Sequence, residues 1–454
     1  MRKILLDFFL IFVLAAFLAP ALLAAPPQSP ETSPAASAQQ KKENSAATPP
    51  PTEAPKKITA YTLPPDLYRK AHRRSRIGFF LRLFGFFYGL LIFLFILSCK
   101  LSAKYRDWAE NFSRNRFLQA VVFTALLVLT IGVLRLPLGV LQEWIEKWYG
   151  ISVQAWGSWL GDWAKAQFLV IIIGIPFAWI LYAAIRKSAR RWWLYFWFAS
   201  IPILLLITFL SPYVIEPMFN KFEPLSGKAP QLVPELQRVT RRAGQEIPPE
   251  RMFWMKASDK TISTNAYVSG FGASKRIVIW DTSIAQETPD EVVTDFGHEM
   301  GHYVLGHIWK GIGFRVVFAL FLLYLGFRSI GWVLARWGTV WAVRGLDDWA
   351  SLPALLLVIS IFSFLAKPIT NGFSRFQENQ ADIYSLEVTH GIIPDPGQAS
   401  AHEFQKWGEA VFVDPDPNPL DVFLFYDRPT VTDRIHLFAT YDPWSKGEEP
   451  QFVK

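Results

Sequence analysis

The chain has 454 residues, of which 51% are hydrophobic and 16% aromatic, whereas only 19% are charged. Soluble domains carry about 25% charged residues, so this composition is typical of a membrane protein and excludes an ordinary soluble domain. The formal net charge is +8, and the basic residues lie mostly beside apolar runs, which indicates anionic lipid rather than nucleic acid as their partner. The single cysteine, Cys99, excludes an intramolecular disulfide.

The N-terminus combines two basic residues, an apolar run over 4–23 and small residues at 24–26. This pattern predicts a cleaved signal peptide over 1–25, but the run is also long enough to be an uncleaved first transmembrane helix. Residues 26–60 are rich in Pro and Ala, so we expect a disordered linker there. The basic segment Arg69–Arg76 follows, either as a collar that binds lipid headgroups or as ordinary membrane-flanking charge.

Six apolar runs of membrane-spanning length come next, four within residues 61–216 and two within 313–370. Trp and Tyr crowd their ends, as expected at the two membrane interfaces. The predicted spans are Ile77–Leu97, Phe117–Leu138, Phe168–Ile185, Trp193–Val214, Phe314–Leu334 and Leu352–Ile369.

A polar segment over 217–312 separates the fourth span from the fifth. It contains a helical pattern over 232–239 and two strand-like runs, Arg251–Met255 and Arg276–Trp280. Short strands can offer a free edge to which an extended peptide adds as a further strand. We therefore expect a peptide-binding edge in this segment.

The most informative motif is the sequence HEMGH, which begins at His298. Because residues i and i+4 share a helix face, His298 and His302 can ligate one Zn²⁺. Glu299 can then reach a water on that metal as a general base. Leu305 and Ile308 stand where a metzincin would continue its ligand motif, so that class of protease is excluded.

A catalytic zinc needs a third protein ligand. His307 lies five residues after His302, roughly 140° from the ligand face of an ideal helix, so we expect a supporting role for it. Glu378 is the better candidate, in a helical run directly after the last span. Asp382 lies one turn further on, where a carboxylate can hydrogen-bond a ligand histidine; an ordinary solvated helix face is the alternative.

With these motifs in order, the chain resembles the integral-membrane zinc metallopeptidases typified by the type I CAAX prenyl endopeptidase, over roughly residues 62–440. The resemblance implies a mainly α fold: a polytopic membrane helix bundle that encloses a water-filled chamber, with a zincin-like metalloprotease domain that carries a small β-sheet. The catalytic domain would comprise 217–312 and 371–454. The resemblance rests on FNKFEPL from Phe219, Asn265-Ala266-Tyr267, KRIVIWDT from Lys275, HEMGH with His307, and ENQAD from Glu378.

The resemblance also implies site residues. Glu378 becomes the third ligand of one zinc per chain, and Asn265, with Ala266 beside it, lies where the substrate backbone binds. Arg434 matches an arginine that lines the site. Arg428 stands where the family has a histidine that stabilises the oxyanion. Arginine can donate to an oxyanion but cannot shuttle protons as histidine can. Arg428 is therefore either a functional substitute for the histidine, a sign of a weakened or differently tuned enzyme, or the result of a slip in aligning this stretch with the family.

The predicted function is a zinc-dependent endopeptidase in which Glu299 activates water. The substrate would be a peptide or protein, with or without an attached lipid, and nothing indicates nucleic acid or a particular oligomeric state. A membrane quality-control protease is one alternative. A transporter that uses Arg135 and Lys367 is a second, although both fit better as snorkelling side chains near span ends. A scaffold that has lost activity is the third.

The side of the membrane that carries the zinc segment depends on the N-terminus. We expect a multi-pass protein of a bacterial inner membrane. If residues 1–25 are cleaved, the basic loops 100–116 and 186–191 are cytoplasmic and the zinc segment lies outside the cytoplasm, in accord with the positive-inside rule. An uncleaved N-terminus reverses this orientation and matches the one typical of the family. Sequencing the N-terminus of the purified protein decides between them.

Overall fold

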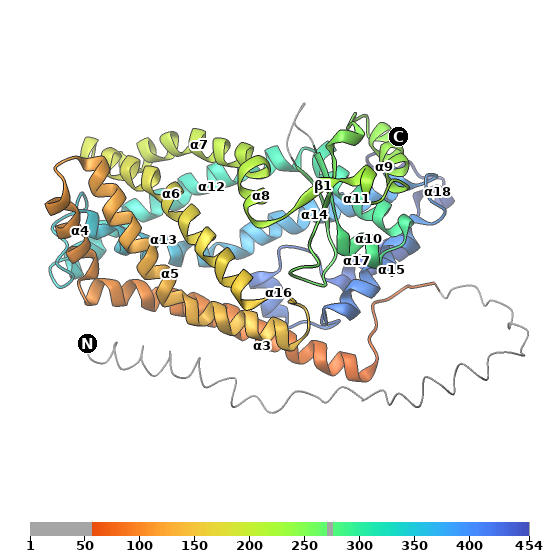
Figure 1. The fold of residues 1–454 in the computed structure, drawn as a ribbon, viewed down its shortest axis with the longest axis horizontal. Helices are drawn as coiled ribbons and strands as arrows, with labels where there is room; N and C mark the ends of the chain where they lie inside the picture. The colour runs from red at the N-terminus through yellow and green to blue at the C-terminus, as the bar shows by residue number, and fades with distance from the viewer. Residues whose placement is uncertain (1–56, 270–275, 454) are drawn as a thin grey trace, which may run out of the picture.

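The computed structural model describes residues 57–269 and 276–453. The expected signal peptide and almost all of the expected linker lie outside these ranges. The fold is mainly α-helical, with one small sheet, as the sequence predicts. In Figure 1 most of the long helices gather on the left of an elongated molecule, and the sheet lies on the right with the shorter helices. The first long helix, α3 (Pro65–Ser98), runs along the lower edge beneath both parts.

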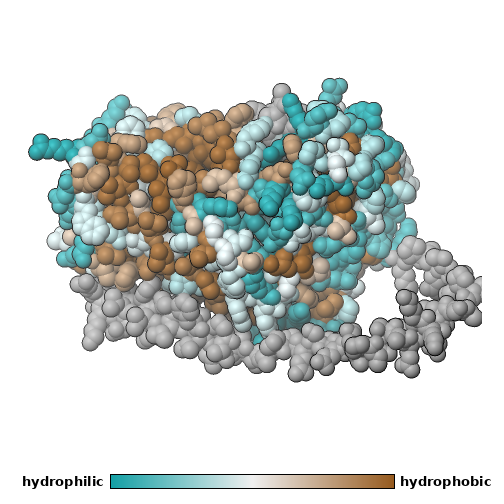
Figure 2. Space-filling model, viewed as in Figure 1, coloured by the Kyte–Doolittle hydropathy of each residue, from teal (hydrophilic) through white to brown (hydrophobic). Residues whose placement is uncertain are grey.

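The membrane half is built from α3 to α7, α12 and α13. Within the described residues, five helices are long and apolar enough to cross a membrane, and a bent pair makes a possible sixth. Only 6% of the apolar window of α7 is buried inside the protein, which leaves this helix facing lipid. Figure 2 shows the corresponding apolar surface. The bounds are α3 Pro65–Ser98, α4 Leu101–Phe112, α5 Arg116–Trp148, α6 Trp156–Lys187, α7 Trp192–Leu210, α12 His307–Trp337 and α13 Leu352–Leu365.

The last predicted span, Leu352–Ile369, differs from the expectation of one straight helix. The chain breaks between α13 and α14 (Lys367–Thr389), and the pair is bent by 51°. Pro368 lies in the first turn of α14, where its missing N–H and its ring prevent α13 from continuing. The bend directs α14 out of the helix bundle and toward the sheet (Figure 1). Lys367 therefore lies at this break, with its ammonium 4.5 Å from the centre of the Phe425 ring.

The other half contains a four-stranded sheet in the order β1-β2-β4-β3. Strand β2 pairs parallel with β4, while β1 and β3 pair antiparallel with their neighbours. Strands β2 and β4 match the two predicted runs, whereas β1 and β3, of three and four residues, were not predicted. Strand β3 is an edge strand of the sheet, and it begins directly after Asn265. The bounds are β1 Phe222–Pro224, β2 Met252–Met255, β3 Ala266–Ser269 and β4 Arg276–Trp280.

Helices surround this sheet and share one core with it. Leu236, Ile277, Phe296 and Tyr384 all belong to this core, which joins the sheet to α9, α11 and α14. The remaining bounds are α8 Glu216–Phe219, α9 Leu232–Arg242, α10 Asp281–Gln286, α11 Pro289–Val304, α15 Pro396–Ala410, α16 Pro419–Phe425, α17 Val431–Thr440 and α18 Pro443–Lys446.

Helices α11 and α14 pack so closely that the contact requires glycine. A Cβ at Gly301 would lie 3.0 Å from the Tyr384 Cβ and 3.1 Å from the Ala381 Cα. We expect Gly301→Ala to lower the free energy of unfolding by about 1–3 kcal/mol, because the two helices must separate to admit the methyl group. Thermal unfolding in detergent measures this. Gly313→Ala on α12, where nothing lies within 4 Å of the new Cβ, is the control and should not destabilise the protein.

Candidate metal centre

Helix α11 starts with a capping box, which fixes where the HEMGH motif lies along the helix. The Thr288 N–H donates to the Glu291 carboxylate at 2.7 Å, and the Thr288 hydroxyl accepts from the Glu291 N–H at 3.4 Å. Pro289 at the first helical position needs no hydrogen-bond partner for its nitrogen. The helix then runs unbroken through His298 and His302, so the two imidazoles project from one face, as predicted.

The structure brings His298, His302 and Glu378 together. The two Nε2 atoms lie 3.1 Å apart, and the Glu378 carboxylate oxygens lie 3.5 Å from His298 Nε2 and 3.3 Å from His302 Nε2. Donors that surround zinc tetrahedrally at about 2.0–2.1 Å are about 3.3–3.4 Å from each other, so this set has the spacing of a zinc site. The Glu378 Oε2 atom is also buried and accepts no hydrogen bond from the described residues. The residues therefore fit a zinc ion.

Asp382 and Arg434 support His298 from the side opposite Glu378. Asp382 Oδ1 lies 2.7 Å from His298 Nδ1, and the Arg434 guanidinium donates to both oxygens of Asp382, with Nε 2.9 Å from Oδ2. Asp382 is 1% exposed and Arg434 is 5% exposed. An Nδ1–H held by this carboxylate leaves Nε2 free to face a metal. Asp382 therefore lies where a carboxylate can hydrogen-bond a ligand histidine, and Arg434 holds Asp382 while its Nη2 atom lies 3.3 Å from His298 Nδ1.

His307 supports the second histidine. His302 Nδ1 lies 3.0 Å from His307 Nδ1, and His307 Nε2 lies 3.2 Å from the Gln380 side-chain oxygen. If His302 Nε2 faces a metal, Nδ1 carries the proton and donates to His307, which in turn donates from Nε2 to Gln380. His307 lies beside His302 and outside the cluster of His298, His302 and Glu378. Gln380, from the ENQAD motif, was not singled out from the sequence.

The electrostatics of the two motif residues His298 and Glu299 suit a metal site with a general base. Burial disfavours the charged imidazole, but the neighbouring carboxylates of Asp382 and Glu378 outweigh it and raise the pKa of His298 to about 9. A metal at Nε2 must therefore displace a proton, so its affinity falls as the pH falls. Burial raises the pKa of Glu299 above its usual value, toward the range in which a carboxylate is an effective base near neutral pH.

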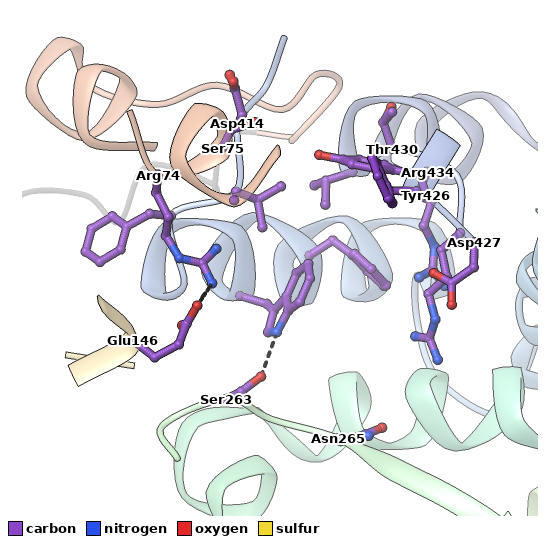
Figure 3. Close-up of a pocket in the computed structure, with 18 of the residues that line it drawn as sticks. Arg74, Ser75, Glu146, Ser263, Asn265, Asp414, Tyr426, Asp427, Thr430 and Arg434 are labelled. Atoms are coloured by element: carbon purple, nitrogen blue, oxygen red, sulfur yellow. Dashed lines mark hydrogen bonds and ion pairs between the residues drawn. The ribbon is translucent and has the colours of Figure 1, made fainter. Parts of the chain in front are cut away.

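A cavity of about 670 Å³ lies beside this centre (Figure 3). It reaches the centre through Arg428, which contacts Glu378, and Arg434, which contacts Asp382, and not through His298, His302 or Glu378 themselves. Asn265 lines it from the segment before β3, and Arg428 and Arg434 line it from the C-terminal part of the chain. Ala266 is 1% exposed, so it can offer substrate only its backbone. The Arg428 side chain is 54% exposed, and its Nε lies 3.4 Å from Glu378 Oε2. Of the two predicted arginines, Arg428 is therefore the one that reaches the exposed side of the ligand set.

Two carboxylates in the cavity wall were missed in the sequence. Burial and the neighbouring Glu299 raise the pKa of Asp295 to about 7, and burial and Asp295 raise the pKa of Glu403. Asp295 lies one turn before the motif on the same helix face, a spacing that could have indicated it. Glu403 comes from α15, and no local pattern connects it with α11.

Replacement of Asp382 by Asn tests the support behind His298. We expect zinc affinity to fall about 10–100-fold, because the amide can no longer hold the Nδ1–H and Arg434 with a negative charge. Competition with a chelator, read as zinc retained per chain, measures this. Asp290→Asn, at an exposed position in the first turn of α11, is the control and should keep wild-type affinity.

Comparisons with known proteins identify the family of the chain. Residues 44–221 match the family model described as CAAX prenyl protease N-terminal, five membrane helices, and residues 227–436 match peptidase family M48. The chain is 31% identical to the uncharacterized metalloprotease YhfN of Bacillus subtilis, over 82% of this chain and 85% of the relative. It is 26% identical to a CAAX prenyl protease 1 homolog of Dictyostelium discoideum, over 79% of this chain and 81% of that one.

The fold also matches a solved structure. The crystal structure of S. mikatae Ste24p superposes with a TM-score of 0.70 at 21% sequence identity, over 84% of this chain and 90% of that chain. The chain is an integral membrane protein with the fold and family of a metalloprotease. It belongs to peptidase family M48, with the N-terminal membrane domain of the CAAX prenyl proteases.

Proposed function

We propose that the protein is a membrane-embedded, zinc-dependent endopeptidase in which His298, His302 and Glu378 hold one zinc ion. The observation that carries the proposal is the 3.1–3.5 Å spacing of their donor atoms. A complete ligand set with supporting partners argues against a scaffold that has lost activity. The membrane is proposed to be a bacterial inner membrane, since a Bacillus protein is among the relatives.

The chain's own residues supply the rest of the chemistry. Zinc, when bound, acts as a Lewis acid and makes water more acidic. Glu299 accepts the proton of the attacking water and passes it to the leaving amine. An extended substrate pairs with the free edge of β3, where Asn265 holds its backbone and presents the scissile carbonyl to the ligand set. Arg428 donates to the oxyanion that develops as water attacks.

The proposed role of Arg428 predicts a specific kinetic loss. Arg428→Ala should lower kcat by about 10²-fold while KM changes little, because the donor acts on charge that exists only in the transition state. Arg428→His should restore part of the loss, since histidine also donates. Steady-state kinetics on one peptide measure both variants. A rise in KM with unchanged kcat would instead assign Arg428 to substrate binding.

Cleavage assays with the purified protein test the function itself. We expect hydrolysis of an extended peptide that stops with a zinc chelator and returns with added zinc. Absence of chelator-sensitive hydrolysis for every peptide would contradict the proposal. Matched peptides with and without a farnesyl group then separate two substrate classes: faster cleavage of the farnesylated peptide assigns a prenyl-type protease, and equal rates assign a membrane protease of broader specificity.

A further inference from the structure

One face of α3 carries a stripe that is basic in its first turns and apolar beyond them. Arg69, Arg73 and Arg76 follow each other at helical spacing, and Phe80 and Phe84 continue the same face. All three arginines and Phe80 are exposed. The apolar part of α3 begins directly after Arg76, so the arginines lie where the helix meets the membrane interface.

These three arginines lack the acidic partners that other basic residues of α3 have. Arg74 pairs with Glu146 at 3.0 Å, and Arg82 pairs with Asp421 at 2.6 Å. In the described part of the chain, no carboxylate forms an ion pair with the arginines of the stripe. The Arg73 guanidinium lies 5.5 Å from the centre of the Trp148 ring, a contact that leaves its N–H groups free to bind an anion.

A groove of about 900 Å³ runs along the stripe, between α3 and α5. Arg69, Arg73 and Arg76 line its basic end, and apolar side chains line the remainder, among them Phe80, Phe84 and Leu141. The helical rise places Phe84 about 12 Å beyond Arg76. An acyl chain that extends from a headgroup at the arginines would run in this direction and over this distance. The order of charge and apolar surface therefore matches the layout of a phospholipid.

We propose that this groove is a binding site for one anionic phospholipid, with its phosphate on Arg69, Arg73 and Arg76 and an acyl chain along Phe80, Phe84 and Leu141. The site lies on the membrane-facing side of α3 and does not depend on the proposed peptidase chemistry. Charge complementarity selects the anionic headgroup, and the apolar groove distinguishes a lipid from a free phosphate.

Native mass spectrometry of the full-length protein in detergent, titrated with phosphatidylglycerol, tests the site. We expect one phosphatidylglycerol to bind more tightly than phosphatidylcholine of the same acyl chains. The variant with Arg69, Arg73 and Arg76 all replaced by Gln should bind phosphatidylglycerol on the order of 100-fold more weakly, from roughly fivefold per lost charge. The matched control replaces the exposed Arg114, Arg190 and Arg191 by Gln and should bind as the wild type does.

Phe80→Gln tests the apolar part at a position that is 59% exposed, so the fold should persist. This variant should lose affinity for both lipids, and glycerol phosphate should not displace bound phosphatidylglycerol. The proposal is overturned if the wild type binds the two lipids equally, or if the two arginine variants lose affinity equally. It is also overturned if Phe80→Gln binds as the wild type does, or if glycerol phosphate displaces the bound lipid. A full-length protein that binds no phosphatidylglycerol overturns it as well.

Discussion

Glu299→Gln should abolish peptide cleavage while the protein keeps its zinc. The amide is nearly the same size as the carboxylate, but it cannot take the proton of the attacking water. We expect kcat to fall by at least about 10³-fold, within the range that general-base catalysis contributes. The measurement is the rate of peptide hydrolysis, with metal content determined on the same preparation.

The control for this variant is Asp290→Asn, which removes an exposed carboxylate from the first turn of the same helix. It should cleave at the wild-type rate. If Glu299→Gln cleaves peptide at a comparable rate, Glu299 is not the base. Loss of activity together with loss of zinc would show instead that Glu299 helps to hold the metal.

Glu378→Gln should have the second large effect, this time on the metal. The substitution removes the charged ligand from a site whose other donors are neutral imidazoles. Loss of a hydrogen-bond partner of a ligand lowers zinc affinity by roughly 10–100-fold, and loss of the ligand itself should lower it by more. The rate of cleavage should fall as zinc is lost. Metal content after dialysis against a chelator measures the change, and excess zinc should restore part of the activity.

Glu246→Gln, an exposed position in the loop after α9, is the matched control for Glu378→Gln and should retain zinc and activity. Unchanged zinc affinity in Glu378→Gln would remove Glu378 from the ligand set. A loss of zinc is informative only if Glu378→Gln stays folded. The melting temperature of this variant is therefore measured as well, with excess zinc present.

The HEMGH helix could be predicted because its information is local. A capping box, helical spacing and two histidines four residues apart all lie within α11. Asp382 was also accessible, because it lies one turn after Glu378 on α14. The pairing of α14 with α11 is not local, and here it came from the resemblance to a known family. The membrane-spanning helices could be predicted from hydropathy, since each predicted span coincides with a helix or with the bent pair.

Other features depend on contacts between distant segments. Glu403 meets Asp295 only because α15 packs beside α11, and Gln380 gains its role only through His307. Strand β3 is held by its pairing with β4. The break between α13 and α14 also serves the site, because a straight span would not bring Glu378 to the two histidines.

X-ray absorption at the zinc edge tests the central claim most directly. The spectrum of the purified wild-type protein should show two imidazole nitrogens and one or two oxygens at about 2.0–2.1 Å, with one zinc per chain. The imidazole signal should weaken in His298→Ala. A spectrum with sulfur or with oxygen alone, or a purified active enzyme without stoichiometric zinc, would contradict the account.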